Sequence, residues 1–245
     1  MYLSAFAAEA VGQSGGRSGG QSDAQTGALS ADALYSDRSN LSSARRAAAL
    51  WEADAAQNRA AFEPAWKLAR VCYWLGGHAP DEERRALLER GIAASRRAAA
   101  ISPGAPEGHF WLAANMGALA ESFGLRAGLK YRKPIKDALE TVRRISPSFM
   151  DGSADRALGR WYFKVPRLFG GSDARAIEYL RASLTYNNQS TISLFFLAEV
   201  LAAEGQKAEA RATLQRVLDA PLDPAWVPED QEYKLKAIAL LASLK

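Results

Sequence analysis

The most concentrated group of charges in this sequence is basic. Around Tyr131 lie Arg126, Lys130, Arg132, Lys133 and Lys136. Residues 126, 130 and 133 have the spacing that places side chains on one face of a helix. Such a face is often simply solvated, but a group of cations also attracts an acidic partner or an anionic solute. The cluster is therefore a candidate for anion binding, with a solvated face as the alternative.

Residues that could form a catalytic or metal centre do not occur in suitable arrangements. The two histidines, His78 and His109, have no partners at the spacing of zinc ligands. No serine has the setting of a nucleophile elbow. Cys72 is the single cysteine and lies in an apolar run, which indicates a buried side chain and excludes an internal disulfide. We therefore predict a protein that is not an enzyme and that binds neither a metal nor a cofactor.

The composition indicates a helical globular protein. Hydrophobic residues make up 48% of the 245 residues and charged residues 24%, which is ordinary for a folded domain. Helix-forming Ala, Leu, Arg, Glu and Lys recur, and runs of β-branched residues are nearly absent. No apolar stretch is long enough to predict a transmembrane segment. The net charge of +4 is spread along helical segments without a reader motif, which argues against nucleic-acid binding.

The first 30 residues differ from the rest. The opening "MYLSAFAAEAV" is apolar and carries small-x-small patterns like the end of an export signal, but it has no basic start. It is followed by "GQSGGRSGGQSDAQTG", whose composition cannot bury a core. We predict that residues 1–30 are a disordered tether or a signal remnant. Residues 31–245 then form the folded domain.

From residue 31 the pattern is helical and repeats itself. Ile-Ser-Pro occurs at 101–103 and again at 145–147, each time after an Arg-Arg-containing segment. Tetratricopeptide units are helix pairs in which a small residue permits close approach and a proline ends the second helix. The register places Arg70, Ala113, Gly159 and Ala198 at the small position. We predict an all-α, tetratricopeptide-like superhelix of about four helix pairs, with a flanking N-terminal helix and a C-terminal capping helix. An ordinary helical bundle is the alternative.

The units are longer than the standard length of about 34 residues. The register places the extra residues between paired helices, at 75–85, 119–134 and 165–171. In the last of these, Pro166 should end one helix, Gly170 and Gly171 should turn the chain, and Ser172 or Asp173 should cap the next helix. This segment is either a packed connector or a contact loop at an opening of the superhelix.

The first helix of each pair should supply the concave face of the array. The register predicts a binding surface that combines aromatic rings with charged groups, formed by Lys67, Trp74, Phe110, Arg156, Arg160, Phe163, Lys164, Phe195 and Glu199. Because arginine pairs with carboxylates and stacks on rings, such a surface suits an amphipathic ligand with an acidic group or an acidic segment of a partner protein. The alternative for Phe163 and Phe195 is that they only pack between units.

Residues 130–240 resemble the TatT family, the tetratricopeptide component of TRAP transporters. The resemblance is most specific in Gly159–Gly171 and in the Trp226-Val-Pro-Glu-Asp segment. The sequence is also similar, more distantly, to eukaryotic regulators of microtubule dynamics, which share the helix pairs and the interrupted Gly-Arg-Trp helix.

The resemblance to TatT implies a non-catalytic extracytoplasmic scaffold that is accessory to a TRAP-type solute transporter. It implies a periplasmic solute-binding protein as the partner, and a homo-oligomer such as a trimer around a ligand-accessible channel. Unlike many members of that family, this chain has no lipobox cysteine near its N-terminus. The alternative function is a general adaptor for protein–protein interactions in the cytoplasm, because one repeat scaffold serves many functions.

Overall fold

Helices follow one another through almost all of the chain that the structure, a computed structural model, describes, which is residues 29–244. The α-helices are α1 (Ala31–Ser36), α2 (Leu41–Gln57), α3 (Phe62–His78), α4 (Asp81–Ile101), α5 (Pro106–Ser122), α6 (Gly124–Ile145), α7 (Ser153–Lys164), α8 (Asp173–Ser183), α9 (Thr191–Ala203), α10 (Lys207–Asp219) and α11 (Val227–Ser243). The predicted tether or signal remnant lies outside the described residues, except for Leu29 and Ser30.

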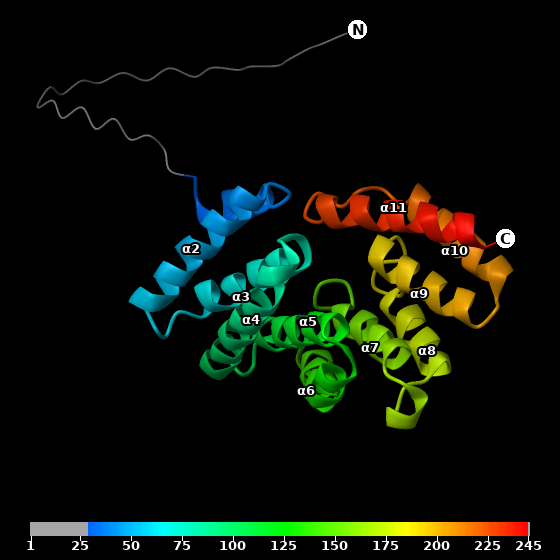
Figure 1. Cartoon of the computed structure of the whole chain (residues 1–245), viewed down its shortest axis with the longest axis horizontal. Coiled ribbons are helices and arrows are strands. Elements are labelled where there is room, and N and C mark those ends of the chain that lie inside the picture. Colours follow the sequence, from blue (N-terminus) through cyan, green and yellow to red (C-terminus); the bar gives the residue numbers. More distant parts are fainter. Residues whose placement is uncertain (1–28, 245) are drawn as a thin grey trace, which may run out of the picture.

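The helices pair and stack into a curved array (Figure 1). The pairs are α3 with α4, α5 with α6, α7 with α8, and α9 with α10. The first helices of the pairs also contact one another in the order α3, α5, α7, α9, and α9 contacts α11. The all-α, tetratricopeptide-like fold with four helix pairs and a C-terminal capping helix is thus confirmed. Two helices, α1 and α2, precede the first pair where one was predicted.

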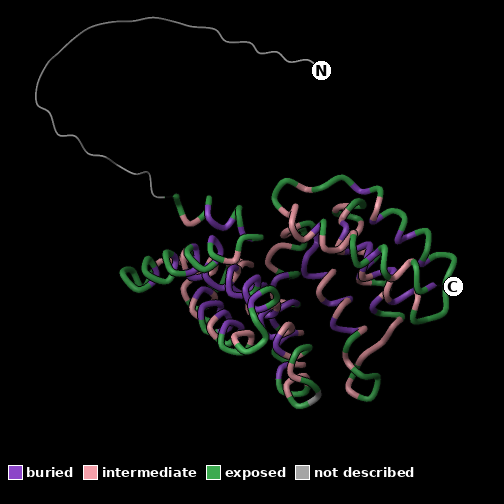
Figure 2. Tube along the Cα trace, turned by 45° about the horizontal axis from the view of Figure 1, so that its top comes forward, coloured by how far each residue is buried: buried purple, intermediate pink, exposed green. Residues whose placement is uncertain are grey.

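Close approach within the pairs depends on small residues, as Gly159 shows. A Cβ atom on Gly159 would lie 2.6 Å from Leu180 Cγ and 3.0 Å from the Ala176 carbonyl oxygen, so α7 and α8 pack with no room for a side chain there. Ala198 is fully buried at the matching position of the next unit. Buried residues line the inside of the helix layers and exposed residues the outside (Figure 2).

The extra residues of the first two units lengthen helices and do not form connectors. Only residues 79 and 80 separate α3 from α4, and only Phe123 separates α5 from α6. The predicted insertions at 75–85 and 119–134 are therefore wrong as connectors, because their Ala, Leu, Arg and Lys content favours helix. Even Pro134 lies inside α6, where the burial of Tyr131 and Ile135 offsets the cost of the proline.

The third insertion, residues 165–171, lies between the paired helices α7 and α8, as the register predicted. After Pro166 the chain makes one turn of 3-10 helix, η1 (Arg167–Phe169), and Gly170 has a φ of +100°. Gly171 has no space for a Cβ beside the Val165 carbonyl group. The Ser172 side chain then caps α8. Leu168 is 87% exposed, so it does not join an apolar cluster in this segment.

The two ends of the array meet. The start of α11 lies beside the connection between α1 and α2 (Figure 1). Arg38, in that connection, is only 3% exposed and donates to Glu229 through Nε and Nη2 and to the Ala225 carbonyl oxygen at 3.0 Å. The array is therefore closed by side chains. None of the described helices has the length and apolar character needed to cross a bilayer.

Candidate functional site

A groove of about 1090 Å³ lies at the centre of the closed array. Its walls come mainly from α3, α5, α7, α9 and α11, so the first helices of the pairs supply much of the concave face, and α6 adds a further part of the wall that includes Leu129, Arg132 and Ile135. The aromatic part of the lining includes Tyr73, Trp74, Phe110, Trp111, Phe196 and Tyr233. A large groove with apolar walls and a few charged groups is the usual form of a ligand site.

Five of the nine predicted site residues line this groove: Trp74, Phe110, Arg156, Arg160 and Lys164. Three of these five, Arg156, Arg160 and Lys164, come from α7. Helix α7 lies between α5 and α9 in the row of first helices, so it faces the groove at its middle.

The other four predicted residues are not part of the lining. Lys67 is held at the N-terminal end of the array by Asp32, at 2.8 Å, and by Glu63, at 2.5 Å. Phe195 is 7% exposed and packs against Tyr233, with ring centres 5.4 Å apart.

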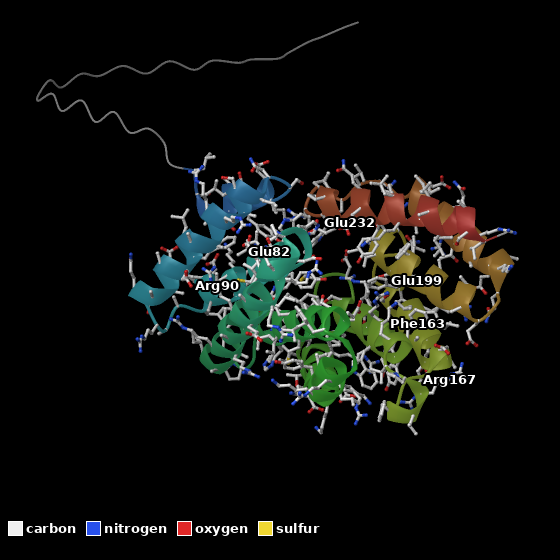
Figure 3. All side chains as sticks on the ribbon, in the orientation of Figure 1. Glu82, Arg90, Phe163, Arg167, Glu199 and Glu232 are labelled. Carbon is white, nitrogen blue, oxygen red and sulfur yellow. The ribbon has the colours of Figure 1, made fainter. Side chains whose placement is uncertain are left out.

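Phe163 is half-buried and packs on the core, and Glu199 lies beside the groove as the partner of Arg160 and Lys164 (Figure 3). The side chains of Phe163 and Phe195 therefore pack within the helix array and do not line the groove. At both positions the next residue lines the groove, Lys164 after Phe163 and Phe196 after Phe195, because successive residues of a helix point about 100° apart.

Arg160 and Lys164 are already partnered within the protein. Arg160 donates to both carboxylate oxygens of Glu121, at 3.1 and 3.0 Å, and to Glu199 at 2.5 Å. Its guanidinium also lies 4.7 Å from the Phe196 ring centre. Burial lowers the pKa of Arg160, but the two carboxylates outweigh burial and raise it overall. Lys164 Nζ lies 3.9 Å from Glu199.

Arg156 is different, because no hydrogen bond or ion pair of its side chain occurs within residues 29–244. It is half-buried, and enclosure lowers its pKa. Three groups oppose this effect and raise the pKa of Arg156: the Tyr233 phenol, the Asp151 carboxylate and the Tyr73 phenol.

The rim of the groove carries the residues that close the array. The His78 ring stacks on Trp74, with ring centres 3.6 Å apart, and its Nδ1–H donates to the Trp74 carbonyl oxygen at 2.8 Å. The other nitrogen, Nε2, lies 3.4 Å from Glu232 of α11 (Figure 3). We call the two cross-array pairs, Arg38 with Glu229 and His78 with Glu232, the clasp.

The sequence matches the family of regulator of microtubule dynamics protein 1-3 over residues 29–169, more than half of its length. The chain belongs to this family. Residues 174–234 of this regulator-family protein match the tetratricopeptide repeat. The resemblance to regulators of microtubule dynamics is thus confirmed as membership, and the resemblance to TatT stays a prediction. Tetratricopeptide repeats are a scaffold family and typically not catalytic.

A solved structure with a TM-score above 0.5 shares the fold. A thermophilic tetratricopeptide protein of Thermus thermophilus, TTC0263, is 19% identical, with a TM-score of 0.65 over 86% of this chain and 95% of that chain. YrrB, described as a tetratricopeptide protein with an unusual peptide-binding site, is 19% identical, with a TM-score of 0.45 over 80% of this chain and 92% of that chain. No curated protein gives a match.

In this regulator-family chain, the basic cluster of α6 does not form one surface. Lys133 pairs with Asp137 and Lys136 with Glu140, while Arg132 lines the groove. Arg126 and Lys130 line a separate pocket of about 400 Å³ between α4 and α6. The cluster is therefore divided among three environments.

The remaining chemical groups have structural surroundings. Cys72 is fully buried, and burial raises the pKa of its thiol to about 12. His109 Nε2 contacts the Pro103 carbonyl oxygen at 3.0 Å. Among the described residues, His, Cys, Asp and Glu side chains form no group of three or more that could hold a metal ion.

The clasp is the part of the site that sequence reasoning missed. Arg38 and Glu229 are separated by 191 residues, and neither has a local pattern that marks it. One signal was present: Glu229 belongs to the Trp226-Val-Pro-Glu-Asp segment, where the resemblance to TatT is most specific. The Trp226 ring centre lies 5.9 Å from the Arg38 guanidinium, so both conspicuous residues of that segment contact Arg38.

Proposed function

We propose that this protein is a binding scaffold whose central groove holds an amphipathic ligand with an acidic group. The observation that carries the proposal is the groove itself, with a volume of about 1090 Å³ and walls built mainly from the first helices of successive pairs. Aromatic side chains offer apolar contact area, and cationic groups offer a partner for a carboxylate. A repeat array displays such an extended concave surface because every unit presents the same helix to it.

We further propose that the chain is an accessory of a TRAP-type solute transporter. It acts outside the cytoplasm, binds a periplasmic solute-binding protein and assembles as a homo-oligomer such as a trimer. The resemblance of residues 130–240 to the TatT family supports this role. A groove of this volume also suits a solute, since ligand sites commonly measure about 300–1,000 Å³.

The second candidate is a cytoplasmic adaptor that binds proteins. Membership of the regulator of microtubule dynamics family and the tetratricopeptide match at residues 174–234 favour this candidate. The groove would then hold an acidic segment of a partner protein.

A groove-blocking variant tests the function. Gly117 lines the groove on α5, and a Cβ there meets nothing within 4 Å, so Gly117→Leu should narrow the groove at α5 without disturbing the fold. Gly104→Leu is the matched control, because a Cβ at Gly104 also meets nothing within 4 Å and Gly104 is outside the lining.

The immobilised full chain is incubated with native extract, and bound proteins and small molecules are identified by mass spectrometry. Capture of a TRAP-type solute-binding protein that is lost in Gly117→Leu but kept in Gly104→Leu supports the transporter role. Groove-dependent capture of cytosolic proteins alone supports the adaptor. Capture that is unaffected by Gly117→Leu contradicts a function for the groove.

A further inference from the structure

The groove contains one cation at its middle that the protein leaves uncompensated. Arg156 lies on α7, the central first helix, and lines the groove. No carboxylate of residues 29–244 lies within 4 Å of its guanidinium. The charge of Asp151 raises the pKa of Arg156, but the Asp151 carboxylate accepts its hydrogen bond from Asn187, at 3.0 Å. A charge held in an enclosed site without a partner is unfavourable, so it calls for an anion.

The other cations of the groove contrast with Arg156. Arg160 is held by Glu121 and Glu199, and Lys236 pairs with Glu232 at 2.6 Å. Arg84 pairs with Asp81 at 2.6 Å and donates to the Gly76 carbonyl oxygen at 3.0 Å. Arg132 has no ion pair among the described residues, but it lies against the Phe169 ring, 5.5 Å from its centre, at the η1 connector.

Besides Asp151, the groups that affect the charge of Arg156 are two tyrosine phenols that also line the groove. The phenols of Tyr73 and Tyr233 act on its charge, and enclosure in the groove raises the pKa of both phenols. Both tyrosines therefore keep their protons at neutral pH and cannot neutralise the guanidinium. They can donate hydrogen bonds, so the lining offers an anionic ligand two hydroxyl donors in addition to Arg156.

The charge pattern favours a ligand with a single anionic group. The groove lining contains as many carboxylates as Lys and Arg side chains: Glu121, Asp151, Asp223, Glu229, Asp230 and Glu232 stand against Arg84, Arg132, Arg156, Arg160, Lys164 and Lys236. A peptide segment rich in Asp or Glu would bring its other charges against these carboxylates, and like charges at short range repel. A ligand with one carboxylate and an apolar body avoids this repulsion.

The apolar body has surfaces to rest on. Phe110 and Trp111 line the groove from α5, and Ile192 and Phe196 line it from α9. Helices α5 and α9 lie on the two sides of α7, so these side chains flank the helix that carries Arg156.

We propose that Arg156 anchors the carboxylate of an amphipathic monocarboxylic acid, aliphatic or aromatic, whose apolar body lies between α5 and α9. This inference rests on the proposed ligand-binding function of the groove and names its ligand class. It favours a small solute over an acidic segment of a protein.

Binding is measured by isothermal titration of the full chain with two probe pairs. Each pair joins an acid to its uncharged amide: decanoate with decanamide, and indole-3-acetate with indole-3-acetamide. For at least one pair, the acid should bind wild type about tenfold or more tightly than the amide, the range of a hydrogen-bonded charge pair. Arg156→Gln should abolish this difference, and Arg156→Lys should keep part of it. Arg181→Gln, which changes an exposed cation of α8 outside the groove lining, should leave it unchanged.

The outcomes separate this inference from the function on which it rests. If neither acid binds wild type more tightly than its amide, or if Arg156→Gln keeps the preference, the inference is overturned. Groove-dependent capture in the Gly117→Leu comparison would still support the proposed function in that case. If Gly117→Leu binds the acids as wild type does, the groove is not their site, and both proposals fail for these ligands.

Discussion

The imidazole of His78 and the carboxylate of Glu232 lie 3.4 Å apart and join the end of α3 to the last helix of the array. Glu232 also pairs with Lys236, and its pKa falls to about 2, chiefly because of the hydrogen bond with His78. Burial lowers the pKa of His78, but Glu232 and the Trp74 carbonyl group raise it overall above 6.5.

These shifts predict how stability depends on pH. Because folding raises the pKa of His78, this residue adds to the free energy of unfolding. Its contribution is fully present below pH 6.5 and is lost as the pH rises through the pKa of the folded state. Because folding lowers the pKa of Glu232, this residue also adds to the free energy of unfolding. Its contribution is present above pH 4.5 and is lost as the pH falls towards about 2. This pair should therefore stabilise the fold most between pH 4.5 and 6.5. Because both side chains are about one-third exposed, we expect less than about 1 kcal/mol.

The measurement is the Tm of wild type and His78→Phe from pH 3 to 9, since phenylalanine keeps a ring on Trp74 but cannot be charged. The difference in Tm should be largest in the mildly acidic window and shrink on both sides. His109→Phe, which changes a histidine outside the clasp, should show no such window. A difference between wild type and His78→Phe that does not vary with pH would exclude a titrating pair.

The other half of the clasp should contribute more, because it is buried. Arg38 has 4% of its side chain exposed and Glu229 has 14%. Arg38→Ala would leave Glu229 enclosed without its partner, and breaking a buried pair in this way costs roughly 3–5 kcal/mol. Arg45→Ala is the control, since Arg45 and Glu83 form an exposed pair that should contribute at most about 1 kcal/mol. Urea denaturation measures the free energy of unfolding of both variants. Equal decreases in the two variants would mean that the stability of the array does not depend on its closure.

Gly159→Leu should destabilise the protein through overpacking. The new side chain would meet Leu180 and the backbone of Ala176, and we expect a loss of about 1–3 kcal/mol or more. Gly117→Leu makes the same chemical change on a first helix that has open space, and it should be neutral or slightly stabilising. Denaturant midpoints that do not distinguish the two variants would contradict the close packing of α7 on α8.

Arg156 and Arg160 should respond in opposite ways to loss of charge. Arg160→Gln leaves Glu121 and Glu199 without their shared partner, so its Tm should fall. Arg156→Gln removes an uncompensated charge, so the Tm of the ligand-free protein should be unchanged or higher. Thermal unfolding after removal of any bound ligand checks both expectations. A fall in Tm for Arg156→Gln equal to that for Arg160→Gln would show that Arg156 has a partner within the protein.

The sequence was informative wherever a repeat pattern decided the structure. The small positions at Ala113, Gly159 and Ala198, together with the prolines and glycines of residues 165–171, predicted the helix pairs and the third connector. The first unit was read one residue out of register: Ala69 is the fully buried residue there. Arg70 lies 3.9 Å from the Tyr35 ring centre, so it stacks on α1 and does not allow close approach.

The pairing of Arg160 with Glu199 could have been inferred from the register, because each residue directly follows the small residue of its first helix, Gly159 or Ala198. The pairing with Glu121 could not, because Glu121 lies eight residues after Ala113. The free charge of Arg156 could not have been inferred in this way, because it depends on Asp151 turning to Asn187. Closure by the clasp could not be inferred either, since it depends on the accumulated curvature of all the units.

Closure also sets a limit on how this protein can change its length. An open solenoid grows or shrinks by duplicating or losing a unit, because each unit contacts only its neighbours. Here Arg38 reaches Glu229 only if the right number of units, each with the right angle to the next, lies between them. A gained or lost helix pair would separate these two residues and would also change the width of the groove. The number of pairs is thus fixed by geometry, and diversification must proceed by substitution along the inner wall.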